Sequence, residues 1–134
     1  MLLGEAKRIL GEAGVSVAEY EGALALVIEE GGKEVVVYIT ADDGNGLVYV
    51  MASSNPPIEL GGSATEFLRA SWEIVDTGIP CKISLNEGIV LVELDLDLCH
   101  LNRESLLESI YYVAESMFRL IDKFGVGTGG RGSI

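Results

Sequence analysis

The sequence contains few of the residues from which catalytic and metal centres are usually built. It has one histidine and two cysteines among 134 residues. A cysteine nucleophile needs a base within hydrogen-bond reach, and a zinc site needs more ligands than two separated thiols and one imidazole. No P-loop, G-x-S-x-G, H-E-x-x-H or C-x-x-C motif occurs. These absences indicate a protein that is not an enzyme and that requires no metal or cofactor.

Basic residues are also scarce. Nine lysines and arginines stand against 21 aspartates and glutamates, which gives a formal net charge of −12. A surface this negative repels phosphate groups, so the charge argues against nucleic acids and anionic membranes as partners. The charge suits a soluble protein, or one that meets a basic partner.

Long apolar runs are absent as well. The longest, such as residues 35–39, fall far short of a membrane span. The amino-terminal residues include Glu5, Lys7 and Arg8 and form no uninterrupted apolar region, so we expect no signal peptide. The expected compartment is therefore the cytoplasm, where cysteines normally stay reduced. We expect Cys81 and Cys99 to be small core residues rather than a disulfide.

What the sequence does contain is a regular alternation of apolar segments and turn residues. It predicts one α+β domain over residues 1–124, with an antiparallel meander sheet and helices packed on one face. In chain order we expect a helix at 2–13, three or four strands at 15–20, 23–30, 34–41 and 46–53, a helix at 63–75, strands at 79–85 and 88–96, and a helix at 103–124. The middle helix should begin with a capping box formed by Ser63 and Glu66.

Residues 125–134 are rich in glycine, and we expect them to form a flexible tail. Gly125, Gly127 and Gly130 match the spacing G-x-G-x-x-G. A dinucleotide site requires a strand before this motif and a helix after it. Because a helix precedes the glycines here, the match does not indicate nucleotide binding.

Three acids alternate with leucines near the end of the last predicted strand. Glu93, Asp95 and Asp97 should lie on one face of the strand, and the leucines at 94, 96 and 98 should face the core. Neighbouring acids in such a row are about 7 Å apart, too far to share a small cation without a further ligand. We interpret the acids as a solvated face.

Cys99 and His100 follow this row directly. In an extended chain two neighbouring side chains point apart, so they cannot form a thiolate–imidazole pair with each other. Asn102 stands where an N-cap of the last helix belongs. We therefore interpret the segment as a strand-to-helix joint. The alternative is a small-ligand or enzyme site that uses Asp95, Asp97, Cys99 and His100.

The two central strands are apolar on both faces, at 35, 37 and 39 against 36 and 38, and at 47, 49 and 51 against 48 and 50. A strand of this kind is usually covered on both faces. The last helix carries two adjacent apolar stripes, Leu106, Ile110, Val113, Met117, Leu120 and Phe124, and Leu107, Tyr111, Ala114, Phe118 and Ile121. Two stripes are wider than one face of a sheet needs, which again indicates a further partner surface. The alternative explanation of the second stripe is a thick core helix.

Three helices cover only one face of such a sheet, so we expect a second polypeptide to cover the other. The partner is a second copy of the chain, a bound polypeptide, or both. Aromatic and methionine side chains dominate interface energetics. The interface candidates are Tyr38, Tyr49, Met51, Trp72 and Phe118, and each could equally be a core residue. The apolar face of the middle helix should carry Phe67, Leu68, Trp72 and Val75.

The order of elements resembles a known fold. Residues 67–121 comprise a helix, a hairpin whose second strand alternates apolar, acidic and leucine residues, and a long helix that opens with RESLL. This pattern is similar to the second half of the type III secretion chaperone-like fold, and most similar to its YbjN-like branch. With the preceding helix and meander the resemblance covers about residues 2–124. It implies a dimeric, non-enzymatic protein that binds other polypeptides or acts in regulation.

Overall fold

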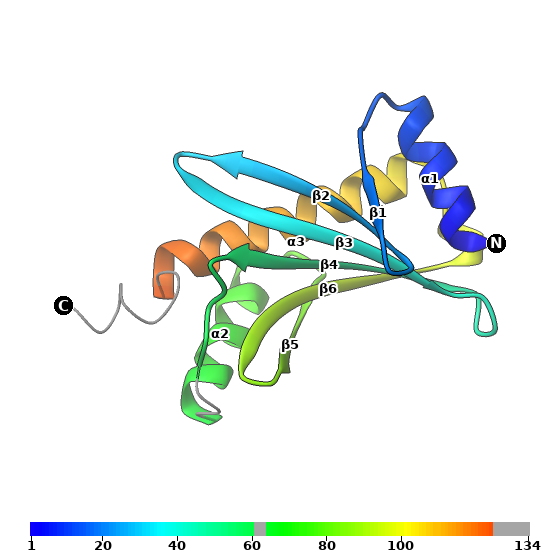
Figure 1. Ribbon diagram of the computed structural model, residues 1–134. Coiled ribbons are helices and arrows are strands. Elements are labelled where there is room, and N and C mark those ends of the chain that lie inside the picture. The colour runs from blue at the N-terminus through cyan, green and yellow to red at the C-terminus, as the bar shows by residue number, and fades with distance from the viewer. Residues whose placement is uncertain (61–63, 125–134) are drawn as a thin grey trace.

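The computed structural model describes residues 1–60 and 64–124. The predicted glycine-rich tail and Ser63 of the predicted capping box lie outside these ranges. The elements are α1 (Leu2–Glu12), β1 (Ala18–Tyr20), β2 (Ala23–Glu30), β3 (Lys33–Asp42), β4 (Leu47–Asn55), α2 (Ala64–Thr77), β5 (Lys82–Asn86), β6 (Ile89–Asp97), a 3₁₀ turn η1 (Leu98–His100) and α3 (Arg103–Phe124) (Figure 1). The predicted order of elements is confirmed, although β1 is shorter than expected.

All strands pair antiparallel in one open sheet with the order β1-β2-β3-β4-β6-β5. The predicted α+β meander is thus confirmed. Three of its hairpins close with two-residue turns whose residues have positive φ, at 21–22, 31–32 and 87–88. Such turns match the twist of the paired strands and set the register. The last of them pairs Lys82 with Glu93 and Ile83 with Val92.

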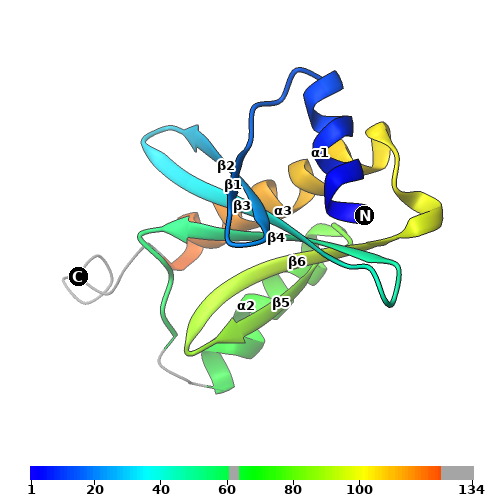
Figure 2. The same ribbon diagram turned by 45° about the vertical axis from the view of Figure 1, so that its right-hand side comes forward.

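The helices lie on one side of the sheet (Figures 1 and 2). α3 crosses the central strands, α1 packs beside it on β2, β3 and β4, and α2 packs against β5 and α3. The core forms where α3 meets the inward side chains of β3, β4 and β6. Its fully buried members include Val35, Val37, Ile39, Val48, Val50, Val92, Leu106, Val113, Met117 and Leu120.

Most of the second apolar stripe of α3 is also buried. Ala114, Phe118 and Ile121 belong to the core, and Leu107 packs against it. Only Tyr111 is exposed, with 61% of its surface accessible. A thick core helix therefore accounts for this stripe, except at Tyr111.

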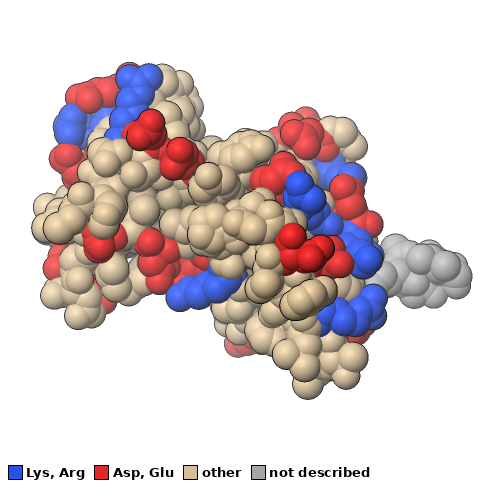
Figure 3. All heavy atoms as spheres, turned by 180° about the vertical axis from the view of Figure 1, so that it is seen from behind, with Lys and Arg blue, Asp and Glu red and all other residues tan. Residues whose placement is uncertain are grey.

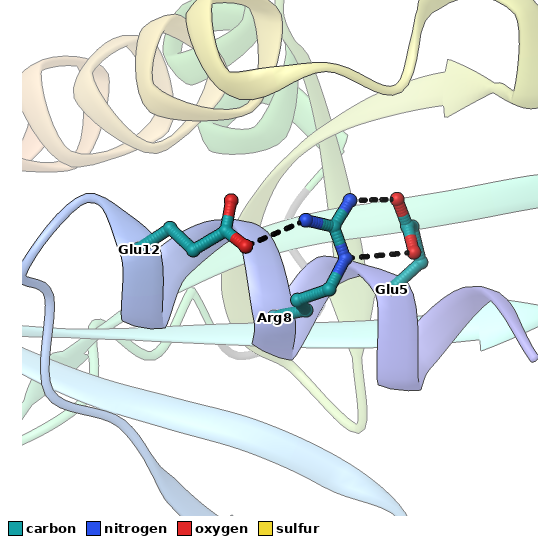
Figure 4. Close-up of polar contacts among 3 residues, drawn as sticks. All are labelled: Glu5, Arg8 and Glu12. Atoms are coloured by element: carbon teal, nitrogen blue, oxygen red, sulfur yellow. Dashed lines mark hydrogen bonds and ion pairs between the residues drawn. The ribbon is translucent and has the colours of Figure 1, made fainter.

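α1 separates its charged side from its apolar side. Arg8 lies between Glu5 and Glu12 on the exposed side (Figure 4), with its Nε 3.2 Å from Glu5 Oε1 and its Nη1 2.8 Å from Glu12 Oε2. Such pairs, three and four residues apart, stabilise a helix. Ala6 and Leu10 on the opposite side are fully buried. α1 thus covers one end of the sheet and keeps its charges in water.

Two predictions at the end of β6 are wrong. Leu98 does not face the core, and Cys99 is not a core residue, because both are exposed. β6 ends at Asp97, whose Oδ1 accepts a hydrogen bond of 3.0 Å from the backbone N–H of His100 and so caps η1. The backbone turns there, and the strand alternation no longer applies. The predicted N-cap is confirmed, since Asn102 Oδ1 accepts a bond of 2.9 Å from the N–H of Ser105.

Candidate interaction surfaces

The side chains of the acidic row do not converge on one point. Lys82 Nζ lies 3.6 Å from Glu93 and 3.2 Å from Asp95 on the face of the sheet opposite α3. Asp97 instead contacts His100, with Oδ1 2.7 Å from Nδ1. Within residues 1–60 and 64–124, no group of three or more histidine, cysteine, aspartate and glutamate side chains could hold a metal ion. Glu93 and Asp95 thus form salt bridges with Lys82 on one face of the sheet, and Asp97 caps the turn that follows β6.

Burial and hydrogen bonding shift the pKa of three groups on or beside this segment. Burial raises the pKa of the half-buried Cys81 thiol, which disfavours the thiolate. Burial also raises the pKa of Glu93, and the neighbouring Asp95 adds to this rise while Lys82 opposes it. The hydrogen bond with His100 lowers the pKa of Asp97. Asp97 is therefore held as a carboxylate, which caps the turn.

In the described part of the chain, the face of the sheet opposite α3 carries no helix (Figures 1 and 2). The pairing places Tyr38 beside Met51 and Ala25, and Tyr49 beside Thr40 and Asp95, all on this face. Tyr38 is exposed, whereas Tyr49 and Met51 are half-buried by their neighbours on the sheet. Three of the predicted interface residues therefore share one open surface.

A second open surface lies on α2. Leu68, Trp72 and Val75 occupy one side of the helix and are 67%, 65% and 63% exposed. Ala70 and Ile74 form the opposite side and are buried. We call the three exposed residues the α2 stripe. In Figure 3 the surface over α2, low in the view, is largely uncharged.

A shallow cavity of about 390 Å³ lies beside the α2 stripe, between α2 and the end of α3. It is lined by Thr65, Leu68, Arg69, Trp72, Glu73, Lys123 and Phe124. The guanidinium of Arg69 stacks over the Phe124 ring at 5.5 Å from its centre, and Lys123 Nζ lies 3.5 Å from Glu73. These contacts lie at the rim of the cavity.

The predicted interface residues thus lie on different surfaces. Trp72 is on the α2 stripe, and Phe118 is buried on the α3 side of the sheet, away from Tyr38. Sequence reasoning identified Leu68 and Val75 as apolar helix residues but did not place them at an interface. The available signal was their spacing with Trp72, at i, i+4 and i+7, next to a separate row formed by Ala70 and Ile74.

No protein-family model and no curated protein matches this sequence. Solved structures do match over most of the chain. A chain of the ExsC–ExsE complex gives a TM-score of 0.66 at 14% identity, over 93% of this chain and 96% of that chain. A chain of the HopA1–SchA chaperone–effector complex gives 0.58 at 8% identity, over 88% of each chain.

An uncharacterized protein from Methanothermobacter thermautotrophicus gives a TM-score of 0.51 at 13% identity, over 93% of this chain and all of that one. At these identities the likeness concerns the fold. The chain therefore has a chaperone-like fold, which it shares with a chain of a chaperone–effector complex over 88% of its length.

Proposed function

We propose that this protein is a non-enzymatic, chaperone-like or regulatory protein that acts as a homodimer and binds segments of other polypeptides. The observation that carries the proposal is the α2 stripe, three large apolar side chains in a row that the folded chain leaves open. The similarity of the chain's fold to chains of the ExsC–ExsE and HopA1–SchA complexes supports the same function. The sequence pattern of residues 67–121 favours the YbjN-like branch.

The α2 stripe supports self-association because its flanking charges are self-complementary. Arg69, Glu73 and Asp76 form the next row on the helix, with the cation at one end and an anion at the other. Two α2 helices packed antiparallel about Trp72 would bring Arg69 of each copy near the acids of the other. A two-fold contact of this kind is the commonest in homo-oligomers.

The energy available from such a contact is substantial. Fully burying a large apolar side chain contributes about 1.5–3 kcal/mol. Aromatic side chains at the centre of an interface contribute most to binding. Because the α2 stripe offers a tryptophan between two aliphatic residues, we place the centre of the dimer contact at Trp72.

The open face of the sheet supports the binding of polypeptide segments. Tyr38, Tyr49 and Met51 are the kinds of side chain that interfaces favour, and they adjoin one another on β3 and β4. In this proposal the dimer contact and the segment-binding surface are separate, so one molecule uses both at once.

Light scattering coupled to size-exclusion chromatography tests the dimer. We expect a dimer at micromolar concentration and a rise in its dissociation on dilution. A monomer at that concentration contradicts this part of the proposal. Capture of co-purifying polypeptides tests the proposed segment binding, with the Tyr38→Ser and Met51→Ser variants as controls. Segment binding on this face is contradicted if the variants retain the same proteins as the unmodified chain.

Among residues 1–60 and 64–124, no helix combines the length and the hydrophobicity that a membrane span requires.

A further inference from the structure

The cavity between α2 and the end of α3 has the size of a small-ligand site. Its volume of about 390 Å³ falls within the range of roughly 300–1,000 Å³ that such sites span. Its apolar wall is formed by Leu68 and Trp72 of α2 and by Phe124 of α3. Phe124 is buried, whereas Leu68 and Trp72 are exposed. The wall therefore offers apolar surface that the described part of the chain leaves open.

Basic residues, which are scarce in this chain, gather around the cavity. A second hollow of about 260 Å³ adjoins it, and Glu73 and Lys123 line both. In Figure 3 basic side chains gather at the right of the view. Four of the nine lysines and arginines line one of the two hollows or pair with a residue that does, namely Lys33, Arg69, Arg119 and Lys123.

Arg69 differs from the other three cations, because they have carboxylate partners. The pairs are Lys33 with Asp122, Arg119 with Glu115 and Lys123 with Glu73. The guanidinium of Arg69 instead lies over the Phe124 ring, 5.5 Å from its centre. Among the described residues no carboxylate pairs with Arg69. Arg69 therefore brings an uncompensated positive charge to the cavity.

The position of Arg69 suits it to receive a carboxylate. A guanidinium that lies over an aromatic ring uses its flat face and leaves the N–H groups at its edge free to donate. Two such N–H groups match the two oxygens of a carboxylate, and the resulting pair is stronger than neutral hydrogen bonds. The contact with the Phe124 ring also restricts the Arg69 side chain, so less entropy is lost when an anion binds.

The wall and the cation together select the ligand. Trp72 presents an exposed indole ring, which favours a flat aromatic body because offset rings attract each other beyond the area they bury. The formal net charge of −12 would repel a polyanion. A small ligand with one negative charge meets much less of this repulsion and still pairs with Arg69.

We propose that the cavity between α2 and the end of α3 binds a small aromatic carboxylate. The ring of the ligand packs on Leu68 and Trp72, and its carboxylate accepts hydrogen bonds from Arg69. This inference goes beyond the proposed function, because it assigns a small-molecule site to the chain. Leu68 and Trp72 also belong to the α2 stripe, so a bound carboxylate and a second copy compete for them. The ligand should therefore shift the proposed dimer toward the monomer.

Two matched probes test the proposal. 2-Naphthoate and 2-naphthylmethylammonium share one ring system and carry opposite charges. Calorimetry measures their binding, and the fluorescence of Trp72, the one tryptophan of the chain, reports whether they reach the cavity. We expect naphthoate to bind about tenfold more tightly than the ammonium compound, although the net charge of the chain favours the cation. Equal binding of the two probes, or tighter binding of the ammonium compound, would overturn the proposal.

Two arginine variants locate the site. Arg69→Gln removes the charge from the cavity and should weaken naphthoate about tenfold. Arg103→Gln is the matched control, because Arg103 is also exposed on a helix and has no carboxylate partner among the described residues. It lies at the start of α3 and should leave naphthoate binding unchanged. Equal binding by the two variants and the unmodified chain would show that Arg69 does not receive the carboxylate, and the proposal would be wrong.

Val75→Asn separates this inference from the proposed dimer. Val75 belongs to the α2 stripe but is not among the described residues that line the cavity. The substitution should therefore weaken the dimer and leave the ligand site intact. If the α2 stripe is the dimer contact, Val75→Asn should bind naphthoate more tightly than the unmodified chain.

Equal binding of naphthoate by these two chains, lost in both with Arg69→Gln, supports the inference and contradicts a dimer contact at the α2 stripe. Failure of both chains to bind naphthoate overturns the inference and leaves the dimer in place.

Discussion

α2 and α3 carry similar apolar patterns and differ in where those patterns face. Both of the apolar stripes on α3 are largely buried, because that helix crosses the centre of the sheet. α2 lies at the β5 edge and against α3, and only its narrow side of Ala70 and Ile74 is buried. Leu68, Trp72 and Val75 face outward, whereas Phe67 packs partly against the core. The comparison shows that apolar spacing identifies an amphipathic helix, whereas its place on the sheet decides which side becomes core.

The largest expected difference between the two helices is in stability. Leu120→Ala in α3 should lower the free energy of unfolding by about 2–5 kcal/mol, because a fully buried leucine leaves a cavity. Leu68→Ala in α2 should change it by no more than about 0.5 kcal/mol for the monomer. Urea denaturation at low protein concentration measures both. Equal losses would show that the α2 stripe is core and would remove the basis for the dimer.

The next effect concerns association. Trp72→Asp should weaken the dimer by about 2 kcal/mol or more, a loss typical of an aromatic residue at the centre of an interface. Tyr20→Asp is the matched control, since Tyr20 is equally exposed but lies on β1. Sedimentation equilibrium compares the two variants with the unmodified chain. Equal dissociation of both variants would point to a general charge effect instead of a contact at α2.

A smaller effect is expected at the start of α3. Asn102→Ala removes the acceptor for the N–H of Ser105 and should cost about 1 kcal/mol of stability. Asn102→Ser retains a capping oxygen and should restore most of the loss. Thermal unfolding followed by circular dichroism distinguishes them. If both variants behave alike, the cap does not contribute to anchoring α3.

The smallest effect is the pH dependence of the joint before α3. The bond with His100 lowers the pKa of Asp97 in the folded state. The stabilisation from Asp97 is therefore present above the ordinary carboxyl pKa and is lost as the pH falls through the lowered value. Asp97→Asn should abolish this acid-induced change in amide exchange at 98–101 and leave amide exchange in α2 unaltered. Persistence of the acid response in Asp97→Asn would assign it to another group.

Several features of the fold were predictable because they depend on local chemistry. Glu87 and Gly88 form a two-residue turn, and this alone predicts that Lys82 faces Glu93. The 22-residue helix from Arg103 to Phe124 follows from its cap and its periodicity. The antiparallel meander follows from the turn residues between apolar segments.

Other features depend on the packing of distant elements, which sequence patterns do not contain. Phe118 is buried because the side of α3 that carries it packs beside β2. Trp72 is exposed because α2 lies at the edge of the sheet. The exposure of Leu98 and Cys99 follows from one capping bond at Asp97 that interrupts an otherwise regular alternation. β1 pairs only with residues 23–25 of β2 because it is three residues long, whereas the apolar pattern predicted a longer strand.

The pairing of β4 with β6, which we call the seam, joins two parts of the sheet that each form locally. The strands β1 to β4 connect through short turns, as do β5 and β6, whereas Leu47 meets Asp97 across the intervening α2 and hairpin. Closing such a long loop is an entropic barrier that turn formation does not lower. We therefore expect the two halves to gain exchange protection first during refolding and the seam to gain it last, which pulse-labelling at Val50 and Leu94 would detect. Until the seam closes, β4 and β6 both present free edges to the cell.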